Sequence, residues 1–80
     1  MTKAFVLINC ELGSEEHVIS ELKTFSDVKE VQGTFGAYDI IAEISSESIE
    51  KIRETITGKI RKIGKIRSTL TLTKIEGQGL

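Results

Sequence analysis

The chain is 80 residues long, with 39% hydrophobic and 29% charged residues, so we expect a single soluble domain over residues 1–80. Its formal net charge of -1 excludes a general electrostatic attraction to nucleic acid or anionic lipid. The chain has a single cysteine, Cys10, so it cannot form an intramolecular disulfide. No apolar run approaches the roughly 20 residues of a membrane-spanning helix. The expected compartment is the reducing cytoplasm, reached without a signal peptide.

The first part of the chain predicts a strand, a helix and a second strand. Residues 4–10 are apolar at nearly every position, which predicts a strand that is apolar on both faces. Ser14 is placed to cap a helix whose first turn carries Glu15 and Glu16. Apolar side chains then recur at helical spacing, at Val18, Ile19, Leu22 and Phe25. A second strand is expected over residues 28–34.

The next part predicts a chain reversal, a third strand and a second helix. The chain turns at residues 35–37 and returns as a strand over residues 38–44. Ser45 and Ser46 are placed to open the second helix. Isoleucines recur there at steps of three or four residues, at Ile49, Ile52, Ile56, Ile60 and Ile63. Gly64 is the expected end of this helix, and Gly58 is a point where it can bend or fray.

A last strand is expected over residues 66–75, followed by a short tail over residues 76–80. One face of this strand carries Ile66, Ser68, Leu70 and Leu72, and the other carries Arg67, Thr69, Thr71 and Thr73. The element order is therefore β-α-β-β-α-β. This order predicts an α+β, ferredoxin-like sandwich, in which two helices cover one face of a four-stranded antiparallel sheet.

The other face of the predicted sheet is too apolar for a solvated surface. An antiparallel sheet with one wet face should alternate apolar and polar residues, but Phe5 and Leu7 have apolar neighbours, and Ile41 follows Ile40. At about 25 cal/mol per Å², leaving this face in water would forgo several kcal/mol. We therefore expect a homodimer that pairs the two sheets. The alternative is a monomer in which these side chains are half-exposed.

The residues of common catalytic and metal sites are missing. His17 is the only histidine, and the helical spacing places it on the exposed side of its helix. One histidine and one cysteine cannot build a closed metal site or a catalytic triad. Neither a Walker loop nor a Gly-x-Gly-x-x-Gly motif is present. We predict no enzyme activity, no metal and no cofactor.

Basic residues gather near the end of the second helix, at Lys59, Arg61, Lys62, Lys65 and Arg67. Positive charge suits a helix C-terminus, where it faces the negative end of the helix dipole. Ferredoxin-like sheets that bind RNA stack bases on aromatic side chains of the central strands. Only Phe5 lies within the first strand, and Tyr38 stands at the start of the third. We therefore do not expect direct nucleic-acid binding.

Residues 33–41, with the sequence Gly-Thr-Phe-Gly-Ala-Tyr-Asp-Ile-Ile, form the strongest candidate binding site. The two glycines release the backbone from steric limits at a hairpin tip. Backbone N–H groups at this tip could bind the carboxylate of a small zwitterion, and Asp39 could bind its ammonium group. The alternative is a tight hairpin in which Tyr38 packs and Asp39 caps the turn.

From Phe5 to Lys74 the chain resembles the C-terminal ligand-binding domain, or RAM domain, of the Lrp/AsnC family of feast/famine regulators. The resemblance rests on residues 5–10, 28–31, 33–39, 63–66 and 68–72, and residues 36–39 (Gly-x-Tyr-Asp) are its most specific part. Family members normally carry a helix-turn-helix domain ahead of this one. Because the first predicted strand begins at residue 4, the resemblance implies a stand-alone effector domain without a DNA-binding domain. Ile63 departs from a proline that the family often has before the glycine.

The resemblance also implies an assembly and a site. Family dimers pair their sheets face to face, like a dimeric α/β barrel, and assemble into rings, often octamers, with free amino acids bound where dimers meet. The implied ligand-binding residues are Thr34, Gly36, Tyr38 and Asp39 of the hairpin, with Thr69 and Thr71 from a neighbouring subunit. The implied function is amino-acid-responsive regulation of transcription by assembly with full-length Lrp/AsnC regulators. The alternatives are an ACT-like regulatory subunit of a metabolic enzyme and a purely structural assembly subunit with an empty pocket.

Overall fold

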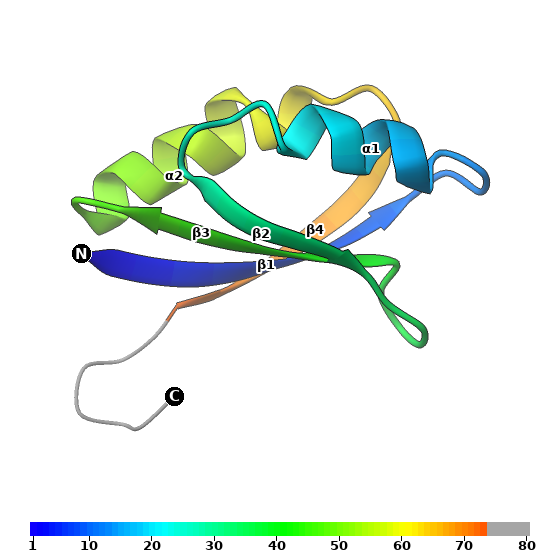
Figure 1. The fold of residues 1–80 in the computed structure, drawn as a ribbon, viewed down its shortest axis with the longest axis horizontal. Coiled ribbons are helices and arrows are strands. Elements are labelled where there is room, and N and C mark those ends of the chain that lie inside the picture. The colour runs from blue at the N-terminus through cyan, green and yellow to red at the C-terminus, as the bar shows by residue number, and fades with distance from the viewer. Residues whose placement is uncertain (74–80) are drawn as a thin grey trace.

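The chain folds into two layers in a computed structural model that describes residues 1–73 (Figure 1). One layer is a four-stranded antiparallel sheet in the order β2-β3-β1-β4. The other layer contains the two helices, both on one face of the sheet. The elements are β1 (Thr2–Cys10), α1 (Glu15–Leu22), β2 (Val28–Gly33), β3 (Ile40–Ser46), α2 (Ile49–Gly58), the 3-10 helix η1 (Ile60–Lys62) and β4 (Ile66–Thr73). The expected ferredoxin-like α+β sandwich is confirmed. Residues 74–75 of the expected last strand and the expected tail lie outside the described residues.

The core lies between the sheet and the helices, because alternate residues of each central strand point toward the helical layer. The buried strand residues are Ala4, Val6, Ile8 and Cys10 of β1 and Ile40, Ala42 and Ile44 of β3. The helices contribute Val18, Leu22, Ile52 and Ile56 to the same cluster. Both predicted helical stripes therefore face the core, and Phe25 packs against it from just beyond α1.

The second helix differs from its prediction at both ends. Its N-cap is Ser48, whose hydroxyl accepts a hydrogen bond from the N–H of Lys51 at 3.3 Å, whereas Ser45 and Ser46 complete β3. The α-helix ends at Gly58, where a residue of low helix propensity allows the backbone to leave the helix. The chain continues through η1, so Ile63 still reaches the core and Gly64 is not the helix end.

Other strand and helix ends also differ slightly from the predictions. β1 begins two residues earlier, at Thr2, and β3 begins at Ile40 rather than at residue 38. Ser14 precedes α1, but its side chain makes no capping hydrogen bond. β2 ends at Gly33, so residues 34–39 form the connection between β2 and β3.

The sheet face opposite the helices carries an apolar surface, here called the sheet patch. Its residues are Phe5, Leu7, Ile41, Leu70 and Leu72. The strand register places Phe5 between Glu43 and Leu72, and Leu7 between Ile41 and Leu70, so these side chains point to the same side. Leu70 and Leu72 are 45% and 47% exposed. The predicted apolar character of both faces of β1 is therefore confirmed.

Candidate functional site

The β2–β3 connection is a tight loop at one end of the sheet (Figure 1). The N–H of Thr34 donates to the carbonyl of Asp39 at 2.8 Å, and the Thr34 hydroxyl donates to the carbonyl of Tyr38 at 2.6 Å. Gly36 has a φ of 125°. This backbone conformation is strained for residues that carry a Cβ, so it favours glycine. Thr34 thus closes the loop, and Gly36 makes its tip possible.

Asp39 is held between this loop and the end of β1. Its N–H donates to the carbonyl of Ile8 at 3.0 Å and to Asn9 Oδ1 at 3.2 Å. Its Oδ2 accepts a hydrogen bond from the N–H of Cys10 at 3.0 Å, a residue 29 positions earlier in the chain. The alternative interpretation expected Asp39 to cap its own turn. Its side chain instead bonds to the end of β1 and so joins two strands.

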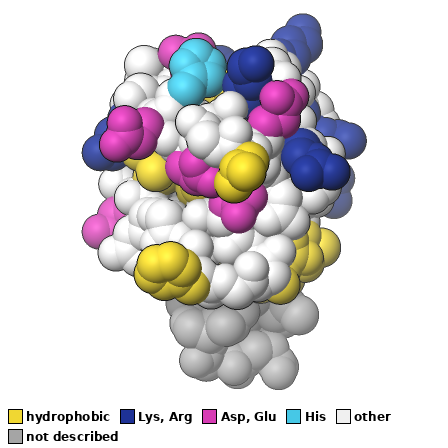
Figure 2. Space-filling view, turned by 90° about the vertical axis from the view of Figure 1, so that its right-hand side faces the viewer, with side chains coloured by type: hydrophobic (Ala, Val, Ile, Leu, Met, Phe, Trp, Pro, Cys, Tyr) yellow, Lys and Arg dark blue, Asp and Glu magenta, His cyan; other side chains and the backbone are white. Residues whose placement is uncertain are grey.

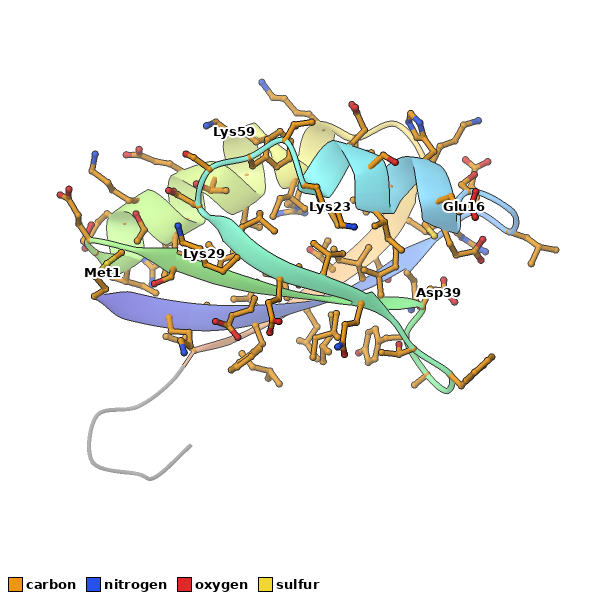
Figure 3. All side chains as sticks on the ribbon, in the orientation of Figure 1. Met1, Glu16, Lys23, Lys29, Asp39 and Lys59 are labelled. Carbon is orange, nitrogen blue, oxygen red and sulfur yellow. The ribbon has the colours of Figure 1, made fainter. Side chains whose placement is uncertain are left out.

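The second carboxylate oxygen of Asp39 is placed differently. Within residues 1–73, no hydrogen bond to Asp39 Oδ1 is formed. The side chain is half-buried, so Oδ1 can meet a ligand while Oδ2 keeps the carboxylate oriented. Figure 3 shows Asp39 at the same end of the molecule as Glu16, near the start of α1.

The electrostatic field at this end is negative. Burial, reinforced by the carboxylates of Asp39, Glu15 and Glu11, raises the pKa of the Cys10 thiol. Figure 2 views this end and shows acidic side chains near its centre, with basic side chains mainly toward one side. The carboxylates gathered at this end favour a ligand cation such as an ammonium group.

Asp39 lies between two shallow hollows. The first, here called the hairpin hollow, is lined by Glu15, Gly33, Thr34, Phe35 and Asp39. The second is lined by Asn9, Cys10, Asp39, Arg67 and Ser68. The fold brings Thr34 and Asp39 together in the hairpin hollow, with Gly36 and Tyr38 in the same loop.

The sequence interpretation missed Glu15, Phe35, Asn9 and Arg67 as neighbours of Asp39. Three of these residues come from other elements, and no local pattern connects them with the hairpin. Phe35 stands inside the quoted hairpin motif, so its aromatic side chain was the one signal that could have identified it.

Thr69 and Thr71 lie away from the hairpin within one copy of the chain. They pair with Ile8 and Val6, whose side chains are buried, so they point toward the helical side of β4. There they line a groove between β4 and α2, here called the β4–α2 groove. A single copy therefore does not bring Thr69 and Thr71 to Asp39.

Other kinds of site find no support in residues 1–73. In this part of the chain no group of three or more His, Cys, Asp or Glu side chains is arranged to hold a metal ion. His17 is exposed on α1, as predicted. The helices in these residues are too short or too polar to cross a bilayer.

Comparisons with known proteins agree with this architecture. The family described as Lrp/AsnC ligand binding domain matches residues 3–76. An uncharacterized HTH-type transcriptional regulator from Pyrococcus horikoshii is 30% identical over 78 residues, covering 95% of this chain and 49% of the regulator. The chain thus spans about half the length of this relative.

Solved structures show the same fold. The crystal structure of FFRP-DM1 has a TM-score of 0.89 and 33% sequence identity, covering 94% of this chain and 100% of that chain. A transcriptional regulator from Neisseria meningitidis, solved as a complex with L-Met, has a TM-score of 0.85. Its identity is 8%, over 96% of this chain and 51% of that chain, so this likeness concerns the fold alone. With the family match over residues 3–76, these findings show that the chain belongs to the Lrp/AsnC ligand-binding domain family.

Proposed function

We propose that the chain is an amino-acid-binding effector domain that regulates transcription through assembly and not through catalysis. The observation that carries the proposal is the Asp39 carboxylate, which lines both hollows and is oriented by the Cys10 N–H at one oxygen, while its other oxygen makes no hydrogen bond within residues 1–73. The family description as a ligand-binding domain supports it, and so does the regulator from Pyrococcus horikoshii.

The ligand is held at both of its charges. Its ammonium group binds Asp39, and its carboxylate binds backbone N–H groups near Gly36. Within residues 1–73, the N–H groups of residues 35–37 make no hydrogen bond, so they are free to bind an anion. Thr34 and Tyr38 complete this part of the pocket, and Thr69 and Thr71 contribute from a neighbouring copy. Hydrogen bonds to charged groups are about twice as strong as neutral ones, which favours a zwitterion.

The sheet patch is the proposed interface of the dimer. Leu70 and Leu72 remain about half-exposed beside Phe5, Leu7 and Ile41, and a second sheet would remove this apolar surface from water. Dimers then join into a larger ring, such as an octamer. A ligand bound between copies binds only the assembled state and stabilises it by mass action. Amino-acid concentration would thereby control assembly, including assembly with full-length regulators in the cytoplasm.

Thermal unfolding of the purified chain with each of the twenty amino acids tests this function. A ligand at 100 times its Kd adds about 2.7 kcal/mol of stability. In a domain of this size, that raises the Tm by roughly 10 °C or more. Asp39→Asn should abolish the shift, because it keeps an oxygen for the Cys10 N–H but removes the charge. Glu47→Gln removes one carboxylate at an exposed position and should leave the shift intact.

The same experiment separates the alternatives. A stable assembly with no Tm shift for any amino acid would refute the sensor and favour a structural subunit. Co-purification with an enzyme of amino-acid metabolism, and not with a transcription regulator, would favour the ACT-like alternative.

A further inference from the structure

Phe35 occupies an unusual position for an aromatic residue. It lies in the loop at the end of the β2–β3 hairpin, and its relative exposure is 107%. A loop of this kind needs glycine and polar residues for its geometry, and Gly36 and Thr34 already meet that need. An aromatic side chain in this position can bury a large apolar area when it enters a pocket of a partner, and aromatic residues are enriched among the residues that dominate binding energy at interfaces.

The β4–α2 groove has the character of a receiving site. Its lining includes the buried Ile52 and Ile56 of α2 together with Thr69 and Thr71 of β4. β4 is an edge strand of the sheet, and no strand within residues 1–73 pairs with its outer side. The groove has a volume of about 410 Å³, which leaves room for a phenyl ring.

The charges of the two surfaces are complementary. Phe35 shares the hairpin hollow with the carboxylates of Glu15 and Asp39. The β4–α2 groove is lined by the exposed guanidinium groups of Arg53 and Arg61. Opposite charges steer such surfaces together, and a guanidinium group can also stack on an aromatic ring.

Phe35 does not reach the groove of its own copy. The hairpin joins β2 and β3, whereas the groove borders β4 at the opposite edge of the sheet. We propose that Phe35 of one copy inserts into the β4–α2 groove of a second copy. The inference rests on the proposed function and deepens it, because the contact brings Thr69 and Thr71 of the receiving copy toward Asp39 of the inserting copy.

This contact has a definite symmetry. Each copy offers one Phe35 and one β4–α2 groove on different parts of its surface, so the interface is heterologous. It can therefore extend beyond a pair and closes only as a ring. The sheet patch lies on a separate face and remains available for the sheet-to-sheet dimer.

Sedimentation velocity on the full chain, with and without a mixture of the twenty amino acids, tests the proposal. We expect the unmodified chain to form particles larger than a dimer, and Phe35→Ser to reduce them to dimers. Leu12→Ser is the matched control, because Leu12 is 98% exposed on a different loop, and it should leave the particle size unchanged. An unmodified chain that never exceeds a dimer would overturn the proposal, as would a Phe35→Ser variant with unchanged particles.

Disulfide trapping identifies the partner surface. The double variant Ala37→Cys/Thr71→Cys keeps Phe35 and places a thiol on the same exposed loop, so it should form a ladder of covalent multimers on mild oxidation, with the native Cys10 buried. The control Leu12→Cys/Thr71→Cys should not. An Ala37→Cys single variant that links efficiently into pairs would mean that hairpin tips meet each other, which also overturns the proposal.

The Phe35 insertion and amino-acid sensing can be refuted separately. An amino-acid Tm shift that depends on Asp39, together with particles insensitive to Phe35→Ser, refutes the insertion alone. Particles that need Phe35, together with no Tm shift for any amino acid, refute amino-acid sensing alone.

Discussion

Replacing the two leucines of β4 that lie in the sheet patch should weaken the sheet-to-sheet dimer by a predictable amount. Burying a leucine fully is worth about 1.5–3 kcal/mol. Leu70 and Leu72 are 45% and 47% exposed, so about half of this, roughly 1 kcal/mol each, remains available for a partner. A symmetric dimer contains both leucines twice, which gives a total of about 4 kcal/mol and a roughly 1,000-fold change in Kd.

The variant Leu70→Thr/Leu72→Thr tests this estimate by sedimentation equilibrium. Threonine suits a strand and is already common in β4, so the protomer should keep its fold. Circular dichroism checks this point. Leu12→Thr is the control, since this leucine is 98% exposed and lies outside the sheet patch, and the dimer Kd of this variant should be unchanged. A double variant with the same Kd as the unmodified chain would refute burial of the sheet patch and, with it, the shared pocket.

Three further predictions concern stability measured by urea unfolding. Gly36→Ala should lower the free energy of unfolding by about 1–3 kcal/mol, because Gly36 has a φ of 125°. Gly58→Ala should not lower it, because a Cβ at Gly58 meets no atom within 4 Å. Equal effects of the two variants would contradict this prediction. Ser48→Ala should cost about 1 kcal/mol by removing the cap of α2, and an unchanged midpoint would contradict that role. The raised pKa of Cys10 contributes stability below its ordinary pKa that is lost as pH rises through the raised value. Cys10→Ala should therefore flatten the alkaline loss of stability, and an unchanged pH profile would refute this.

Much of the fold follows from local patterns. The apolar stripes of both helices lie at sequence separations of three and four, and the buried residues of β1 and β3 alternate. Such periodicities are visible in the chain before any contact is known, so the element order and the helix-free apolar face could be predicted. Ser48 was missed because the nearby Ser45 and Ser46 are equally good caps by sequence, and the pairing of β3 with β1 decides where the strand ends.

The candidate site was predictable only in part. Thr34, Gly36, Tyr38 and Asp39 are close in sequence and therefore lie in one loop. The bond between Asp39 and Cys10 was not visible, because it depends on the register of strands that are far apart in the chain. The same holds for Thr69 and Thr71, which point into the β4–α2 groove.

The order of residues alone was enough to establish the ferredoxin-like sandwich, its core faces and a glycine-bearing hairpin with an acidic side chain. Three-dimensional packing settled which Asp39 oxygen is already bonded, which leucines share a face with Phe5, and that the threonines of β4 lie across the sheet from the hairpin. The physical reason is the range of the interactions. Helical and strand periodicity acts between near neighbours, whereas strand pairing and the closure of a site join residues through contacts that no short segment contains.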